Sequence, residues 1–155
     1  MTELQTTMIP PVAQVKYRVL YVDTDAGGVV NNGNYLRFLE MGRSEMMRSF
    51  AVPYSEIEKS GLILPVTECY LRYKAPAVYD DLITVNTALA VIKRVSCRFH
   101  YRITCVRDGQ EKLLVKGFTN HACVNVNREG RLVPFPEELR EKIAAIHEQE
   151  NERMV

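Results

Sequence analysis

The chain has 155 residues, of which 46% are hydrophobic and 25% are charged, and its 20 basic and 19 acidic side chains almost cancel. These proportions are typical of a soluble globular protein, and the length predicts one domain over residues 1–155. The balanced charge argues against a dedicated nucleic-acid binder, because such proteins usually carry a clear excess of Lys and Arg.

The chain is expected to open with a lead-in and a strand. Residues 1–11 end in two adjacent prolines, which cannot enter a sheet ladder, so a flexible lead-in is predicted. Residues 12–22 are rich in Val, Tyr and Leu, which suits a first strand. A loop rich in Asp, Gly and Asn follows at residues 23–33.

A long amphipathic helix is predicted at residues 34–50, where apolar side chains recur with helical periodicity. Asn32 or Asn34 can cap its first turn. Gly42 in the helix interior costs about 1 kcal/mol relative to Ala, so a close approach to another backbone is expected there. One or two further helical turns are expected at residues 54–59.

The rest of the chain reads mainly as strands, followed by a charged helix at residues 137–150. In one strand, the odd-numbered residues from Cys97 to Cys105 share an apolar face, while Arg98, His100 and Arg102 share the other. The Asp108-Gly109 dipeptide predicts a hairpin after this strand. The four strands are expected at residues 62–73, 81–93, 97–105 and 111–126.

Strands grouped apart from helices indicate an α+β fold rather than an alternating βαβ fold. An antiparallel sheet with one apolar face needs a cover, and the helix at 34–50 is the one internal element long enough, at about 25 Å. The predicted fold is an antiparallel sheet of five to six strands curled around one long central helix.

The loop at residues 23–33 is the candidate reaction centre. It places Asp23, Asp25 and the pair Gly27-Gly28 between a strand and the start of a helix. The free N–H groups and positive dipole end of a helix stabilise negative charge. A carboxylate fixed beside them is therefore more typical of a reaction centre than of a residue that only packs. The Asp23 side chain is expected to orient the loop.

This loop and the helix after it resemble the hotdog-fold thioesterases of the 4-hydroxybenzoyl-CoA thioesterase family, and among them the YbgC-type acyl-CoA thioesterases. The likeness rests on Asp-Thr-Asp-Ala-Gly-Gly-Val-Val and on Asn-Tyr-Leu-Arg-Phe-Leu-Glu-x-x-Arg, with weaker matches at residues 73–77, 79–82 and 131–136. It implies a hotdog fold that hydrolyses acyl-CoA or aroyl-CoA thioesters to free acid and CoA. Apart from the CoA of the substrate, it implies no cofactor.

The resemblance also implies roles for individual residues. Asp25 would be the catalytic carboxylate, and the backbone N–H of Asn32, with Gly33 next to it, would polarise the thioester carbonyl. One such donor is commonly worth about 10²–10³ in rate. Asp25 could act as a general base or attack the thioester to form an anhydride, and the sequence leaves both routes open.

Asn32 departs from the YbgC-type pattern, which usually has His at this position. Related long-chain acyl thioesterases more often show Val-Asn-Asn before the helix, as Val30-Asn31-Asn32 does here. The backbone donor is the same in both patterns, so the acyl-chain preference stays open while the reaction class does not change.

Substrate phosphates call for cations near the acyl tunnel. The candidate substrate contacts are Tyr35, Arg72, Lys74, Arg94 and Arg98, with Arg128 as a further cation. In the resembling enzymes the active site lies between two subunits, and an open sheet edge favours pairing, so a homodimer or homotetramer is expected.

Two alternatives remain beside acyl-CoA hydrolysis: an acyl-carrier-protein thioesterase of the same fold, and a non-catalytic acyl-thioester-binding protein. A charged side chain beside an apolar acyl chain would add little to the strength of binding, so Asp25 argues against the non-catalytic binding protein. His100, His121 and His147 have no G-x-S-x-G nucleophile to serve, and a sheet role is expected for His121.

The sequence gives no sign of a membrane span, a signal peptide or a metal site. No apolar run approaches the roughly 20 residues that a membrane helix needs, and residues 1–14 lack a basic start and an apolar core. The cysteine spacings contain no C-x₂-C pair, so reduced cysteines in a cytoplasmic protein are expected, and Cys97 and Cys105, at even spacing in one strand, are expected to be buried. The cysteines are Cys69, Cys97, Cys105 and Cys123.

Overall fold

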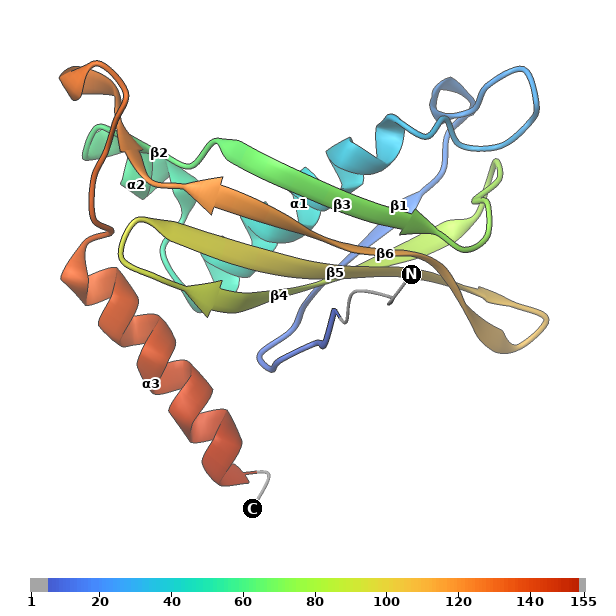
Figure 1. Ribbon diagram of the computed structural model, residues 1–155. Coiled ribbons are helices and arrows are strands. Elements are labelled where there is room, and N and C mark those ends of the chain that lie inside the picture. Colours follow the sequence, from blue (N-terminus) through green and yellow to red (C-terminus); the bar gives the residue numbers. More distant parts are fainter. Residues whose placement is uncertain (1–5, 154–155) are drawn as a thin grey trace, which may run out of the picture.

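A computed structural model describes residues 6–153 and shows a curved antiparallel sheet with a long helix across one face (Figure 1). The five strands lie in the order β1-β4-β5-β6-β3, and every neighbouring pair is antiparallel. The helix, α1, spans Asn34–Phe50, as its periodicity predicts, so the α+β arrangement is confirmed. The strands are β1 Ala13–Arg18, β3 Val66–Tyr73, β4 Leu82–Ile92, β5 Ser96–Arg107 and β6 Gln110–Ala122.

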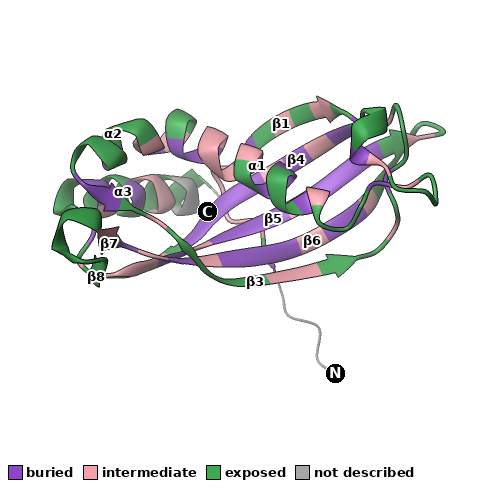
Figure 2. Cartoon of the chain, turned by 90° about the horizontal axis from the view of Figure 1, so that it is seen from above, coloured by how far each residue is buried: buried purple, intermediate pink, exposed green. Residues whose placement is uncertain are grey.

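The core lies between α1 and the central strands, where buried residues are concentrated on β4, β5 and β6 (Figure 2). Helix α1 buries Phe38 and Leu39 against this face, and the apolar side of β5 predicted from its alternation is buried as expected. A Cβ at Gly42 would collide with the Thr87 hydroxyl and lie 2.8 Å from Val85 Cγ1. The close approach expected at Gly42 is therefore confirmed, although its neighbours are side chains of β4 rather than backbone.

The first predicted strand, residues 12–22, is too long. Strand β1 ends at Arg18, and Tyr21–Asp23 form a short 3-10 helix. The reason is the Asp23 carboxylate, which accepts the Leu20 N–H at 2.8 Å and draws the chain into a turn.

The strands predicted at 62–73 and 111–126 are each broken. Pro65, which has no N–H, separates β2 (Leu62–Ile63) from β3. Strand β6 ends at Ala122, and β7 (Val124–Asn125) leaves the main sheet. Strand β2 pairs with β7, and β7 pairs with β8 (Arg131–Leu132), which makes a second, small sheet.

Two further helices flank this core, and both were expected. Helix α2 spans Tyr54–Lys59, and α3 spans Glu137–Arg153, three residues beyond its predicted end. Leu139 and Ile143 of α3 are buried in the core. Within residues 6–153, no helix has both the length and the apolar character that crossing a membrane requires.

The predicted lead-in, residues 1–11, lies partly outside the described residues. Thr6 is buried, and the Thr7 carbonyl accepts a hydrogen bond of 2.7 Å from His100 Nδ1 of β5. The described part of the lead-in therefore contacts the face of the sheet opposite α1, called here the outer face.

Candidate active site

Residues 24–30 form a tight hairpin beside the start of α1, at one end of the sheet (Figure 1). Thr24 pairs with Val30, and the Asp25 N–H donates to the Val29 carbonyl at 2.9 Å. Gly28 has φ +78°, a conformation that a residue with a Cβ rarely adopts. The glycine pair thus lets the chain reverse and return to the helix.

Asp25 lies at the exposed start of this turn. Its Oδ1 accepts the Gly27 N–H at 2.8 Å, which fixes the carboxylate orientation. Within residues 6–153 the second oxygen, Oδ2, has no hydrogen-bond partner. One oxygen therefore holds the side chain in place, and the other can meet a substrate or a water molecule.

Asp23 has the opposite environment, with 1% of its surface exposed. Its carboxylate accepts from the Tyr17 hydroxyl and the Leu20 N–H, both at 2.8 Å, and forms an ion pair with Arg37 of α1. Its carbonyl accepts from the Asn34 side chain at 2.7 Å. Asp23 therefore ties β1, the loop and α1 together, the orienting role expected from its position.

Neither Asn32 nor Asn34 caps α1 as predicted: the cap position is Gly33, which has no side-chain cap, and Asn31 holds the turn before it. The Asn31 side chain accepts the Gly33 N–H at 2.9 Å, and its carbonyl accepts the Asn34 N–H at 2.9 Å. The Gly33 N–H is therefore occupied. The Asn32 N–H has no hydrogen-bond partner in the described part of the chain, so it is the donor left for a ligand oxygen.

Tyr73, the last residue of β3, fixes the position of Asn32. Its hydroxyl donates to the Asn32 carbonyl at 3.0 Å. Burial raises the pKa of Tyr73, so this hydroxyl stays protonated at neutral pH. Tyr73 was not among the site residues predicted from the sequence. The feature that could have suggested it is a tyrosine immediately before the Lys74-Ala75-Pro76 break at the end of a strand.

Two pockets flank Tyr73 and share Asn32 as a wall. The first, of about 250 Å³, is also lined by Val30, Tyr35 and Lys74. The second, of about 330 Å³, is also lined by Leu36 and Leu71. The unpartnered N–H of Asn32 thus lies where these two spaces meet.

Tyr35 is 2% exposed and accepts the Ala77 N–H at 3.1 Å through its hydroxyl. Burial raises the pKa of this hydroxyl. Tyr35 therefore forms part of the pocket wall while it holds the segment after β3, and Lys74 is the one predicted cation that lines the same pocket.

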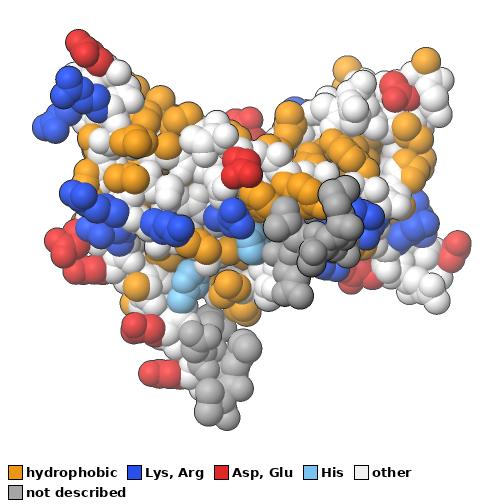
Figure 3. Space-filling model, viewed as in Figure 1, with side chains coloured by type: hydrophobic (Ala, Val, Ile, Leu, Met, Phe, Trp, Pro, Cys, Tyr) orange, Lys and Arg blue, Asp and Glu red, His pale blue; other side chains and the backbone are white. Residues whose placement is uncertain are grey.

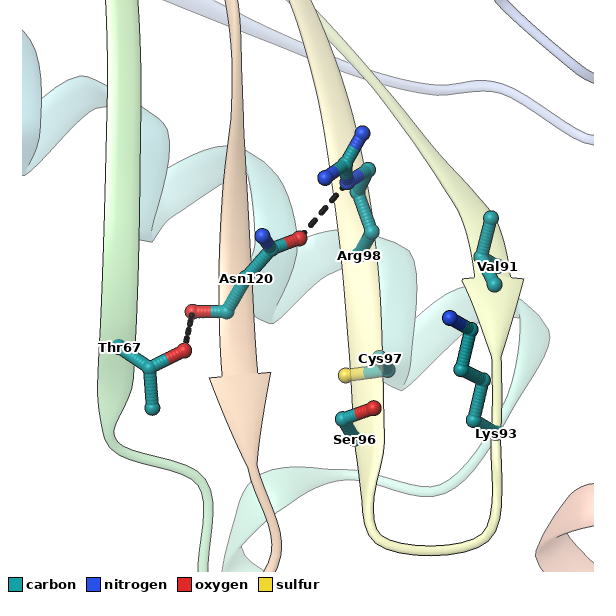
Figure 4. Close-up of a pocket in the computed structure, with 7 residues that line it drawn as sticks. All are labelled: Thr67, Val91, Lys93, Ser96, Cys97, Arg98 and Asn120. Atoms are coloured by element: carbon teal, nitrogen blue, oxygen red, sulfur yellow. Dashed lines mark hydrogen bonds between the residues drawn. The ribbon is translucent and has the colours of Figure 1, made fainter.

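The other predicted cations lie away from the hairpin. Arg94 lies in the turn between β4 and β5, at the opposite end of the sheet (Figure 1). Arg98 lines a separate pocket of about 370 Å³ near that turn (Figure 4). There its Nε donates to Asn120 Oδ1 at 2.7 Å, and its Cζ lies 4.1 Å from the centroid of the Phe118 ring. Within one chain, Arg94 and Arg98 are not brought to Asn32.

Arg72 belongs to a basic row on the outer face. Arg72, Lys116 and Arg102 lie side by side in register across β3, β6 and β5. Lys and Arg side chains can be followed across this face in Figure 3. Within residues 6–153, no group of three or more His, Cys, Asp or Glu side chains is placed to hold a metal ion.

Comparison with known proteins agrees with this geometry. Residues 19–143 match the thioesterase-like superfamily. The chain is 34% identical over 131 residues to the acyl-CoA thioesterase YbgC of Haemophilus influenzae, covering 84% of this chain and 90% of that protein. It is 27% identical over 144 residues to the 1,4-dihydroxy-2-naphthoyl-CoA hydrolase of Thermosynechococcus vestitus, covering 92% of this chain and 96% of that protein.

The fold also matches solved structures. The 4-hydroxybenzoyl CoA thioesterase of Pseudomonas sp. strain CBS-3 superposes with a TM-score of 0.76 over 84% of this chain and 98% of its own, at 20% identity. At that identity the likeness bears on the fold alone, and it confirms the hotdog arrangement expected from the loop and helix.

Proposed function

The chain belongs to the thioesterase-like superfamily, and we propose that it hydrolyses the thioester bond of acyl-CoA or aroyl-CoA substrates to a free acid and CoA. One observation carries the proposal: a fixed, exposed carboxylate and an unpartnered backbone N–H, Asp25 and Asn32, lie in one loop at the start of α1. The names of the relatives, which act on acyl-CoA and dihydroxynaphthoyl-CoA, support this substrate class.

The thioester carbonyl oxygen would accept the Asn32 N–H. As negative charge develops on that oxygen, this donor and the positive end of the α1 dipole stabilise it without rearrangement. Tyr73 holds the neighbouring carbonyl and so keeps the donor in place.

Asp25 promotes the attack on the thioester carbonyl carbon by one of two routes. As a general base, it takes a proton from water, the oxygen adds to the carbonyl carbon, and the C–S bond breaks to release the CoA thiolate. As a nucleophile, its oxygen replaces the thiolate to give an acyl anhydride, which water then hydrolyses. Both routes use the carboxylate oxygen that the hairpin leaves without a partner.

The two pockets at Asn32 accommodate the two sides of the thioester. The pocket lined by Leu36 and Leu71 offers aliphatic side chains to the acyl group. The pocket lined by Lys74 suits the pantetheine side, where the cation lies nearer the polar part of CoA.

We include a homo-oligomer and a cytoplasmic location in the proposal. Strand β3 forms an edge of the sheet, and residues Val66 to Cys69 are exposed along it, a surface that a second copy can cover. All four cysteines are free thiols, which supports a reducing compartment.

The second candidate substrate is an acyl group carried on acyl carrier protein. The basic row of Arg72, Lys116 and Arg102 favours it, because such a surface suits an acidic protein partner.

One assay separates these candidates. Free-thiol release is measured for short, long and aromatic acyl groups, each presented on CoA and on acyl carrier protein. We expect turnover of CoA esters, with the aliphatic or aromatic preference read from kcat/KM. Faster turnover of carrier-bound groups would favour the second candidate, and no thiol release from any substrate would refute the proposed hydrolysis.

A further inference from the structure

A second pocket lies farther along α1 than the pocket at Asn32 that Leu36 lines. Leu36 lines the first, and Glu40 and Arg43 line the second, of about 300 Å³. These three residues share one face of the helix, since side chains three and four apart are neighbours. On the opposite wall, Leu71 of β3 lines the first pocket and Pro65, just before β3, lines the second. The two pockets therefore lie one after the other between α1 and the side of the edge strand, and this region is called here the groove.

The far part of this groove contains a cation without an acidic partner. Arg43 is half-buried, and within residues 6–153 no carboxylate forms an ion pair with it. It lies about 13 Å farther along the helix axis than Asn34, at the helical rise of 1.5 Å per residue. Its guanidinium carries five N–H donors, and the neighbouring hydroxyls of Tyr54 and Tyr101 can accept only some of them.

Buried hydroxyl groups surround this guanidinium. Burial raises the pKa of Tyr54 and raises that of Tyr101 to about 12, while the nearby Arg43 charge opposes both shifts. Tyr54 lines the groove end, and its buried hydroxyl lies near the Arg43 guanidinium without a well-formed hydrogen bond in the described part of the chain. Both phenols are therefore neutral, and the Tyr54 hydroxyl can still donate or accept a hydrogen bond.

Tyr101, by contrast, is fully engaged behind the pocket. Its hydroxyl meets Thr119 Oγ1 at 2.7 Å, and Thr119 meets His121 Nε2 at 2.8 Å. His121 Nδ1 donates to the Leu64 carbonyl at 2.9 Å, and Leu64 lines the pocket. This chain of hydrogen bonds holds the floor of the groove end in one arrangement.

The rim of the same pocket is acidic, and this charge limits which chemical groups of a ligand can bind there. Glu40 and Glu58 line it and are exposed. A ligand carboxylate would be attracted by Arg43 but repelled by both glutamates. A plain hydrocarbon end would remove Arg43 from water and would give no acceptor to the N–H donors that the two phenols leave unused. A hydroxyl group accepts from Arg43 and can donate to Tyr54 or to a rim carboxylate, so it suits all of these groups.

We propose that Arg43 and Tyr54 form a specificity site for a hydroxyl group at the far end of the acyl chain, so that the enzyme selects hydroxylated over plain acyl thioesters. This inference rests on the proposed function for the placement of the thioester at Asn32. The Arg43 side chain leans toward the start of the helix, because helical side chains tilt toward the N-terminus, so a medium-length acyl chain reaches it.

Binding, rather than turnover, tests this site directly. Non-hydrolysable thioether analogues of octanoyl-CoA and ω-hydroxyoctanoyl-CoA are titrated into the wild type by calorimetry. We expect the hydroxylated analogue to bind about tenfold or more tightly, the advantage of a hydrogen bond to a charged group. Tyr54→Phe, which removes one oxygen and keeps the ring, and Arg43→Met should each reduce that ratio to below about threefold.

Arg48→Met is the matched control, because Arg48 is exposed on α1 and pairs with Glu45 outside the groove. It should keep the wild-type ratio. Equal binding of the two analogues to the wild type would overturn the proposal, as would an unchanged ratio in folded Tyr54→Phe. A chain that shows the binding preference but hydrolyses no thioester would refute the proposed function and leave this specificity site standing.

Discussion

Asp23 and Asp25 stand two positions apart, yet one is buried in a network and the other is held at the surface by a single Gly27 N–H. The division follows from what each carboxylate can reach. Asp23 lies beside the Tyr17 hydroxyl and the Arg37 guanidinium, which satisfy it. Asp25 begins a turn that points away from the sheet, so its second oxygen is left for chemistry.

Asp23→Asn tests the structural half of this division. The substitution leaves Arg37 without its ion-pair partner and weakens the acceptor for Tyr17 and Leu20. We expect the free energy of unfolding in urea to fall by about 2 kcal/mol, because the buried acceptor for Tyr17 and Leu20 is weakened while the half-exposed Arg37 stays hydrated. Asp25→Asn serves as the control and should change stability by less than about 1 kcal/mol. Equal losses in the two variants would contradict the division.

Tyr73→Phe tests whether Tyr73 positions the Asn32 peptide. The ring stays and only the hydrogen bond to the Asn32 carbonyl is lost, so we expect kcat to fall about fivefold with KM nearly unchanged. Steady-state kinetics on an acyl-CoA ester measure this split. The control is Tyr79→Phe, whose ring stacks on Tyr21 beside the same loop. A rise in KM alone would assign Tyr73 to substrate binding instead.

Individual residues of the site were only partly predictable. The Asp/Gly loop and helix start pointed to Asp25 and Asn32 because those motifs are local. The turn held by Asn31 and the hydrogen bond from Tyr73 were missed. The first depends on a choice among Asn31, Asn32 and Asn34, and the second joins residues 41 positions apart.

Among the elements, α1 was predictable to the residue because its apolar stripe is long and periodic. The strands were placed correctly but their ends were not. Side-chain and proline effects decide those ends: the Asp23 carboxylate stops the region after β1, and Pro65 divides β2 from β3. Such interruptions leave the hydrophobic alternation almost unchanged, so periodicity alone does not reveal them.

His121 belongs to the buried chain of hydrogen bonds with Tyr101 and Thr119, and it makes the stability of the fold depend on pH. Burial lowers the pKa of His121, so the folded chain holds this imidazole neutral, whereas the unfolded chain binds its proton near pH 6.5. The contribution of the neutral His121 to the free energy of unfolding is fully present above about pH 6.5. It is lost as the pH falls toward the pKa of His121 in the folded chain, by at most about 1.4 kcal/mol per pH unit. Unfolding by urea at successive pH values measures the slope.

His121→Gln should flatten this part of the slope relative to the wild type. An unchanged slope in His121→Gln would show that other groups cause the pH dependence.

At the scale of the whole molecule, the sequence could not place cations relative to the reaction loop. Arg94 and Arg98 looked like substrate contacts by type, yet the sheet carries them to the end opposite Asn32. The position of a residue along its strand does not show at which end of the sheet it lies, because neighbouring antiparallel strands run in opposite directions. The sequence therefore did not show whether Arg94 and Arg98 lie at the same end as the loop.

The exposed edge of β3 is where a second copy is expected to pair. Thr67 lies in an irregularity outside the β3–β6 register, so proline there should disturb the chain's own sheet little while it blocks an added strand. We expect Thr67→Pro to lower the mass measured by light scattering from an oligomer to a monomer, with Thr67→Ala unchanged. A monomeric wild type, or an oligomer of the same mass in Thr67→Pro, would contradict pairing at this edge.

The most direct test of the proposed reaction is the rate of thiol release by Asp25→Asn. Its carboxamide keeps the shape of the loop but neither takes a proton nor attacks the thioester. On the best acyl-CoA ester of the wild type, we expect kcat/KM to fall by about 10²-fold or more, with an unchanged urea midpoint. A folded Asp25→Asn that releases thiol at the wild-type rate would contradict the central role of this carboxylate.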